Sequence, residues 1–243
     1  MKKISRNFSK LIIQEGQGLI EYGLLLALIA IGIVLGMSLA GVSVSDLYCK
    51  AVNGITGGTG CKAQIYCQDS FDGSMSNWQN LQVPNPPPTV GNGQLCFSGA
   101  FQSFNKCSNQ MPQSDYVINL NGITLTQGNG YGVYFRDTVV GSQVSGYAFQ
   151  YDPGASNTLL IRRWANGVEI FNPVMAQVPI NAAVYNVPHD FKIVVKGSVF
   201  TVFMDGKQVM TAKDSTYPTG GAGLRSWDST SACLNDFSIG QVP

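Results

Sequence analysis

The feature that most restricts the fold of this chain is an uncharged run from Leu24 to Val44, whose only hydroxyl side chains are Ser38 and Ser43. About 20 consecutive apolar residues are enough for a helix to cross the core of a bilayer. Four basic residues precede the run, and positive charge on one flank favours a cytoplasmic position for that flank. They are Lys2, Lys3, Arg6 and Lys10. The pattern predicts a long hydrophobic helix that inserts into a membrane with its N-terminus on the cytoplasmic side.

Glu21 stands directly before this run. An ionisable group at the edge of hydrocarbon is costly unless another group neutralises it. A plain membrane anchor gives Glu21 no role, so we expect a partner for its carboxylate.

The stretch Gly16-Gln17-Gly18-Leu19-Ile20-Glu21-Tyr22-Gly23 resembles the class III leader of type IV pilins, most closely the Flp or Tad branch. The resemblance implies a leader at 1–16, cut after Gly16 by a prepilin peptidase, and a pilin-type helix at 17–45. Gln17 would be the first mature residue, and the fifth, Glu21, would meet the N-terminal amine of a neighbouring subunit. It also implies assembly of a homo-oligomeric filament on a pilus platform, with Tyr22 beside Glu21 at the contact.

Two other interpretations of the N-terminus stay open. An ordinary signal peptide could be cleaved after Ser38-Leu39-Ala40, although its apolar core would span about 7–15 residues and this run is longer. A single-pass anchor that is never cleaved is the second. Within the run, Gly32, Gly36 and Ala40 recur every four residues, so they share one face of a helix and would let neighbouring helices approach closely.

The charge of the rest of the chain is balanced, with eleven Lys/Arg and twelve Asp/Glu from Asp46 onward. Such a balance offers no basic stripe, so nucleic acid is not an expected partner. All six cysteines follow the apolar run, which favours disulfides in an oxidising compartment. Zinc is disfavoured because no two cysteines have the spacing of a zinc knuckle. We expect the pairs Cys49–Cys61, Cys96–Cys107 and Cys67–Cys233.

The sequence after the run favours β-structure. Residues 46–66 form a connector rich in Gly and Thr, and a single domain is expected at 67–243. Apolar residues alternate with polar ones in short segments, such as Tyr131, Val133 and Phe135, which puts the apolar side chains on one face of a strand. Asp205-Gly206 between two such segments indicates a hairpin. Many short strands separated by turns predict a sandwich or jelly roll.

Residues 69–242 carry a second resemblance. His189-Asp190-Phe191-Lys192-Ile193-Val194-Val195-Lys196-Gly197 and Gly220-Gly221-Ala222-Gly223-Leu224-Arg225-Ser226-Trp227 are similar to the concanavalin A-like (laminin G-like) superfamily. That superfamily includes lectins, carbohydrate-binding modules and glycosidases. The expected fold class is therefore mainly β, a concanavalin A-like β-sandwich preceded by one long hydrophobic helix.

Catalysis is not expected. A retaining glycosidase needs two carboxyl groups about 5 Å apart, yet after the leader only Glu21 and Glu169 are glutamates, and His189 is the single histidine. No Ser/His/Asp arrangement can be argued from one histidine.

Sugar binding is the alternative to a purely structural role for such a domain, because aromatic faces stack on sugar rings while planar polar groups bind hydroxyls. For both tryptophans among the candidates, ordinary packing in the core or at its rim is the alternative. The candidate residues are Arg136, Gln150, Arg162, Trp164, Arg225 and Trp227.

Calcium is common in the superfamily. Asp69, Asp72 and Asp236 could converge on an ion if the first and last strands pair, although acidic turn residues more often cap their own backbone.

The sequence thus predicts a pilin-like subunit, held in the cytoplasmic membrane before assembly and then displayed in an extracellular filament. Its β-sandwich would bind glycans or surfaces. The alternative is a membrane-anchored, lectin-like protein that never polymerises.

Overall fold

The computed structural model describes residues 21–29, 51–52, 64–111, 114–180 and 184–242, and these fall in two compact units, Met1–Lys62 and Ala63–Pro243. In the first unit, residues 21–29 are helical and all nine are exposed. No helix in the described part of the chain is long and apolar enough to cross a membrane. The rest of the helix expected at 17–45 lies outside the described residues, and so do Gly16, Gln17, Gly32 and Gly36.

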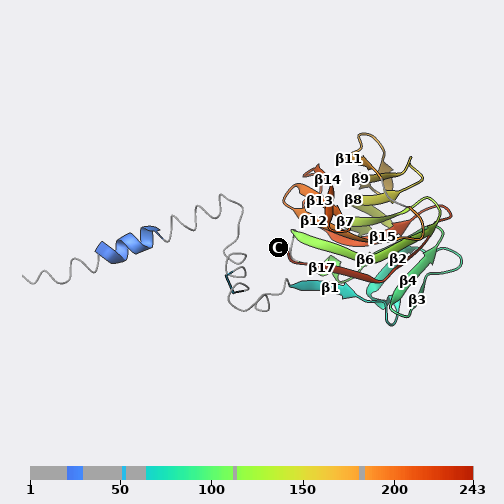
Figure 1. The fold of residues 1–243 in the computed structure, drawn as a ribbon, viewed down its shortest axis with the longest axis horizontal. Helices are drawn as coiled ribbons and strands as arrows, with labels where there is room; N and C mark the ends of the chain where they lie inside the picture. The colour runs from blue at the N-terminus through green and yellow to red at the C-terminus, as the bar shows by residue number, and fades with distance from the viewer. Residues whose placement is uncertain (1–20, 30–50, 53–63, 112–113, 181–183, 243) are drawn as a thin grey trace, which may run out of the picture. The chain divides into compact units, whose positions relative to one another are not determined.

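The second unit is a β-sandwich, as the alternating pattern predicts (Figure 1). Among the described residues, one sheet has nine strands and the other has eight. The larger sheet contains β1 (Ile65–Asp69), β3 (Thr89–Gly91), β4 (Gln94–Ser98), β6 (Tyr116–Gln127), β12 (Pro188–Lys196), β13 (Val199–Met204), β14 (Lys207–Lys213), β16 (Ser231–Leu234) and β17 (Asp236–Gly240).

The smaller sheet carries the features that matter for function. It contains β2 (Trp78–Gln82), β5 (Phe101–Asn105), β7 (Tyr131–Val140), β8 (Gln143–Asp152), β9 (Thr158–Ala165), β10 (Val168–Ile170), β11 (Ala176–Pro179) and β15 (Gly221–Ser226). Its strands run in the order β10-β9-β8-β7-β15-β5-β2, and β11 also pairs with β9. Two single-turn 3-10 helices, η1 (Met75–Asn77) and η2 (Ser108–Gln110), lie in the connections.

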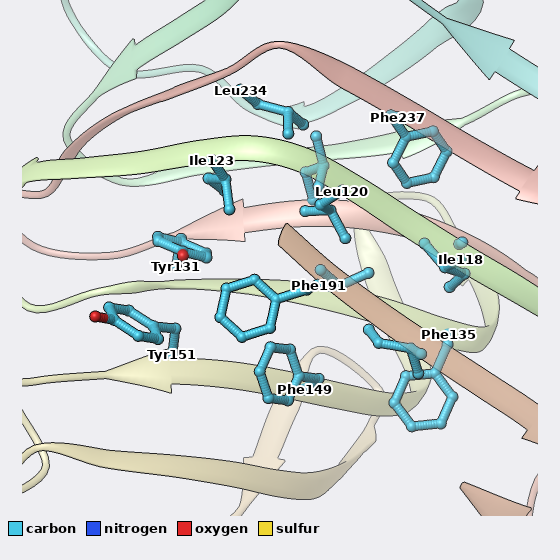
Figure 2. Packing of buried hydrophobic residues seen from close by; sticks show 14 of the residues in the cluster. Ile118, Leu120, Ile123, Tyr131, Phe135, Phe149, Tyr151, Phe191, Leu234 and Phe237 are labelled. Atoms are coloured by element: carbon cyan, nitrogen blue, oxygen red, sulfur yellow. The ribbon is translucent and has the colours of Figure 1, made fainter. Parts of the chain in front are cut away.

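The core lies between the two sheets and is built by period-two alternation. Phe149 on β8 and Phe191 on β12 come from opposite sheets, and their ring centroids are 5.1 Å apart (Figure 2). The alternating residues predicted to face inward are buried in one cluster. They include Ile118, Leu120, Tyr131, Val133, Phe135, Tyr147, Phe149, Tyr151, Phe191, Ile193 and Val195. Alternate residues on β7, β8, β9 and β15 consequently face outward from the smaller sheet.

The hairpin predicted at Asp205-Gly206 is confirmed. The two residues join β13 to β14 and both have positive φ, 50° and 77° respectively. Two consecutive residues with positive φ are what a type I′ hairpin turn requires, and glycine tolerates that conformation without strain.

The expected cysteine pairing in the sandwich is wrong. Cys67 is bonded to Cys107, and Cys96 is bonded to Cys233. The second bond forms because β4 and β16 are neighbours in the sheet, with Cys96 directly opposite Cys233 and 4.1 Å between their Cα atoms. Strand pairing, rather than closeness in sequence, therefore selects the partner. Cys49 and Cys61 lie outside the described residues.

Candidate functional site

A pocket of about 380 Å³ opens on the outer face of the smaller sheet. Its floor comes from outward-facing residues of three strands, Gln150 on β8, Arg162 on β9 and Arg225 on β15. Its remaining walls come from β10 and from the loops next to β7, β8 and β15. The full lining is Asn129, Gln150, Asp152, Gly154, Ala155, Arg162, Glu169, Phe171, Arg225, Trp227 and Asp228.

Gly132 lets the side chain of Arg225 lie flat across this face. It sits on β7 between its two register partners, Gln150 on β8 and Arg225 on β15. A Cβ at Gly132 would lie 3.1 Å from Cγ of Arg225 and 2.7 Å from the carbonyl oxygen of Phe149. Because that space is empty, the Arg225 side chain can pass over β7 at Gly132, and its Nη1 lies 3.2 Å from Oε2 of Glu169 on β10.

Glu169 holds two arginines together. Its Oε1 is 3.3 Å from Nη1 of Arg162 and also accepts a hydrogen bond from the Nε2 amide of Gln150 at 2.7 Å. Its Oε2 accepts a hydrogen bond from Nη1 of Arg225 at 3.2 Å. The Glu169 side chain is 13% exposed, so these ion pairs are screened far less than surface pairs. The clamp fixes both guanidinium groups in place.

Arg225 lies between two tryptophans. Its guanidinium carbon is 4.3 Å from the ring centroid of Trp164 and 4.6 Å from that of Trp227. A cation over an aromatic face is attracted by the ring quadrupole, more strongly where water is excluded. Arg225 is only 7% exposed, and its Nε has no hydrogen-bond partner among the described residues. It is thus a rigid, largely desolvated cation at the edge of an open pocket.

Two further carboxylates and an aromatic ring complete the site. Asp152 receives a hydrogen bond from the backbone N–H of Ala155 at 2.9 Å, and burial raises the pKa of its carboxyl above the ordinary value. Asp228 accepts a hydrogen bond from Nδ2 of Asn129 at 2.7 Å. Phe171 is 61% exposed, with the guanidinium of Arg162 4.8 Å from its ring centroid. The pocket therefore combines donors, acceptors and exposed aromatic surface.

The structure brings together most of the residues predicted to bind glycans. Gln150, Arg162, Arg225 and Trp227 line the pocket. Trp164 is 5% exposed and packs behind Arg225, with its Nε1 buried and unpartnered among the described residues.

Arg136 is not part of this group. Its guanidinium bonds to the carbonyl oxygen of Ser114 and to Asp115, and it lies 5.4 Å from the ring centroid of Phe200 in the core. The expectation that Arg136 belongs with the other candidates is therefore wrong.

Seven of the residues that line the pocket were not predicted from the sequence. Glu169 belongs to a three-residue strand that carries no clear alternation, but its register position opposite Trp164 places it beside the arginines. The end of β8 contributes Asp152, and loops contribute the other five, whose approach depends on folding rather than on local pattern. They are Asn129, Gly154, Ala155, Phe171 and Asp228. The one local signal was Asn166-Gly167, a turn that folds β10 back onto β9.

The three aspartates predicted to bind calcium do not share a site. β1 and β17 do pair, with Asp69 opposite Phe237. However, Asp69 accepts hydrogen bonds from the backbone of Phe71 and from Nε1 of Trp78, whereas Asp236 accepts from Gln68. Asp72 accepts from the hydroxyl of Ser70. Within the described ranges no three His, Cys, Asp or Glu side chains are placed to hold a metal ion, so these carboxylates do not fit the expected calcium site.

No family model matches this chain, and the search of curated proteins gave no match. Solved structures do resemble it. The carbohydrate-binding module CBM66 of Bacillus subtilis is 20% identical with a TM-score of 0.55, over 68% of this chain and 96% of the module. The β-glucanase of Bacillus licheniformis is 12% identical with a TM-score of 0.55, over 72% and 98% of the two chains. The lumenal domain of VIP36, bound to Ca²⁺ and mannose, is 14% identical with a TM-score of 0.53, over 70% and 85%.

These likenesses establish the fold of the second unit, a β-sandwich of the galectin-like and concanavalin A-like kind. They include a carbohydrate-binding module, a mannose-bound lumenal domain and a β-glucanase, so they do not assign an activity.

Proposed function

We propose that the β-sandwich at 63–243 is a carbohydrate-binding domain without catalytic activity, and that the pocket over β8, β9 and β15 is its binding site. The observation that carries the proposal is Arg225, held between Trp164 and Trp227 and clamped by Glu169 beside an open pocket. A preorganised polar group next to aromatic surface is the chemistry that sugar recognition uses, since binding then costs little ordering of side chains.

The pocket supplies groups suited to sugar hydroxyls. Arg162 and Arg225 offer N–H donors, while Asp152, Asp228 and Gln150 offer oxygen acceptors. Hydroxyl groups both donate and accept, so a sugar can use both sets at once. The names of the neighbours support this proposal, because they include a carbohydrate-binding module and a mannose-bound lumenal domain.

The state of Glu169 argues against hydrolysis. Both of its oxygens are engaged by guanidinium or amide groups. A carboxylate acting as a nucleophile or base must direct an oxygen at the reacting atom or its proton, and here the oxygens are directed at Arg162, Arg225 and Gln150. Glu169 is therefore suited to positioning the arginines.

The test uses the isolated unit 63–243, which is compact and contains its own core. Its binding to a panel of immobilised plant, bacterial and animal glycans is measured for the wild type and for Trp227→Ala. Removing the tryptophan should weaken binding at least tenfold. Phe203→Ala, which removes an aromatic ring from β13 in the other sheet, is the matched control and should bind like the wild type. Absence of binding to the whole panel would reject the proposal, and so would sugar release from any member.

A second candidate function concerns the N-terminal unit, and one observation favours it: the described residues 21–29, which include Glu21, are helical. Together with the resemblance of Gly16 to Gly23 to a class III leader, this supports a pilin-like subunit that is processed after Gly16 and assembled through its helices. The subunit would reside in the cytoplasmic membrane and then in an extracellular filament that displays the sugar-binding domain. A membrane-anchored form that does not polymerise is the alternative.

Processing and assembly can be tested separately. Sequencing the mature N-terminus should give Gln17; a start at Gly41 would contradict the pilin interpretation and indicate an ordinary signal peptide. Electron microscopy of cells that produce the protein should reveal filaments. Glu21→Ala should abolish filaments while the sandwich stays folded, because a helix lacking this carboxylate cannot pair with a neighbour's amine. Tyr22→Phe, which keeps the ring and changes no charge, is the control.

A further inference from the structure

The pocket carries more acid than base. Its lining includes three carboxylates, Asp152, Glu169 and Asp228, and two guanidinium groups, those of Arg162 and Arg225. Glu169 pairs with both guanidinium groups. Within the described part of the chain, Asp152 and Asp228 form no ion pair. The negative charges that the pocket leaves uncompensated are therefore those of these two aspartates.

Each of these aspartates has an oxygen available to a ligand. Oδ1 of Asp152 accepts the hydrogen bond from Ala155, and Oδ2 of Asp228 accepts the one from Asn129. The other oxygen of each carboxylate makes no hydrogen bond to the described residues. A sugar hydroxyl that donates to a carboxylate forms a charge-assisted hydrogen bond. A carboxylate or sulfate on the sugar would instead face a like charge, which is strongly unfavourable at a partly desolvated surface.

The acidic pair belongs to a built site. Arg225 lines the same pocket, its side chain is only 8% exposed, and its Nε is unpartnered among the described residues. Its charge is already engaged by Glu169 and by the faces of two tryptophans. The arginines consequently serve as fixed hydrogen-bond donors and leave little free positive charge to attract an anion.

The size of the pocket limits the ligand further. Small-molecule sites span roughly 300 to 1,000 Å³, and this pocket, at about 380 Å³, lies near the lower end. It can enclose one or two sugar residues, whereas a longer chain would extend over the surrounding surface.

Resting on the proposed function, the geometry points to an uncharged sugar unit as the ligand, with Asp152 and Asp228 as the residues that exclude acidic sugars. Neutral sugars satisfy the two free carboxylate oxygens through their hydroxyl groups. Uronic acids and sulfated sugars place a second negative charge against them.

The experiment compares neutral polysaccharides with the same polysaccharides oxidised at their primary hydroxyl groups to carboxylates. Affinities of unit 63–243 are measured by calorimetry at about 0.15 M and about 1 M salt, where the Debye length falls from roughly 8 to 3 Å. The wild type should bind the oxidised form at least tenfold more weakly at the lower salt. The Asp152→Asn/Asp228→Asn double variant should reduce this ratio to within about threefold, and high salt should reduce it in the wild type.

Asp236→Asn is the matched control, since it removes a carboxylate outside the pocket and should leave the ratio unchanged. Equal or tighter binding of the oxidised form by the wild type overturns the inference but leaves the proposed function standing. An unchanged ratio in the double variant also overturns it. Binding to no polysaccharide in either form rejects the proposed function itself and this inference with it.

Discussion

Two buried arginines, Arg136 and Arg225, lie in the same sheet of the sandwich but in different environments. Each lies on a strand of the smaller sheet and each packs over aromatic rings. Arg136 directs its guanidinium at the carbonyl oxygen of Ser114 and at Asp115, beside the core residue Phe200. Arg225 lies beside an open pocket, with its Nε unpartnered among the described residues.

The difference lies in what the hydrogen-bonding groups of each arginine contact. Arg136 donates to the backbone carbonyl oxygen of Ser114 through both Nε and Nη2, and such bonds stabilise the fold. Arg225 is held by one carboxylate and by ring faces that leave donor capacity unused. Burial alone does not distinguish the two arginines, whereas their partners do: Arg136 donates to a backbone carbonyl oxygen outside the pocket, and Arg225 donates to a carboxylate that lines it.

The largest effect is expected from Arg136→Met. The substitution removes three hydrogen bonds and leaves the carbonyl oxygen of Ser114 without these donors, so the free energy of unfolding should fall by about 2–3 kcal/mol. Urea denaturation measures the change. Arg163→Met is the control because the Arg163 side chain is 31% exposed and its ion pair with Asp214 is 3.8 Å long, which predicts a loss below about 1 kcal/mol. Equal losses in the two variants would contradict the structural role of Arg136.

The next effect concerns Asp137, the neighbour of Arg136. Its side chain is fully buried, and neither of its oxygens has a hydrogen-bond partner among the described residues. The nearby backbone N–H of Tyr147 only partly offsets the effect of burial on the pKa of the carboxyl. Burial therefore raises the pKa of this carboxyl well above its ordinary value. Asp137→Asn keeps the shape of the side chain and removes the ionisable group, so it should raise the free energy of unfolding at neutral pH by about 1–2 kcal/mol.

The pH dependence of this effect has a definite sign. The folded state keeps the proton of Asp137 to higher pH than the unfolded chain does, so the wild type loses stability as pH rises above about 4, where a free aspartate ionises. The advantage of Asp137→Asn should therefore be small below that pH and grow above it. Denaturation curves across the pH range measure it, with the exposed Asp72→Asn as the control for loss of a carboxylate. A destabilising Asp137→Asn at every pH would mean that the carboxylate has a strong partner.

The sequence predicts the sandwich because alternation is a local signal. Residues such as Tyr131 and Val133 face the core wherever the strand is regular, and the structure confirms them there. The same rule misplaces Arg136. The register of β7 against β8 shifts between Phe135 and Thr138, and Arg136 has a φ of 49°. This β-bulge interrupts the alternation, so Arg136 packs against Phe200 instead of joining the outward-facing residues.

Contacts between distant segments are the part that the sequence could not predict. Glu169 reaches Arg225 across 56 positions, and Cys96 pairs with Cys233 across 137. No local sequence pattern indicates either contact, because strand order in the sheet decides which residues become neighbours. Three of the predicted pocket residues, Gln150, Arg162 and Arg225, face outward from longer strands, and Trp227 directly follows β15. Those that were missed came from loops, from the end of β8 and from the short strand β10.

The smallest effect is expected from Arg225→Lys, and it most sharply separates the two arginines. Lysine keeps the charge but lacks the planar group that lies between Trp164 and Trp227. Its single ammonium also cannot both bond to Glu169 and present a fixed donor to the pocket. The Kd for a bound sugar should rise about fivefold, or ~1 kcal/mol, while the free energy of unfolding changes by less. Calorimetry with the best ligand from the panel measures the sugar affinity, and urea denaturation measures the free energy of unfolding.

Arg136→Lys is the matched control and should have the opposite profile, with lost stability and unchanged sugar affinity. If Arg225→Lys instead lowers stability and leaves sugar affinity unchanged, Arg225 is a structural arginine like Arg136, and the binding site must lie elsewhere on the sandwich.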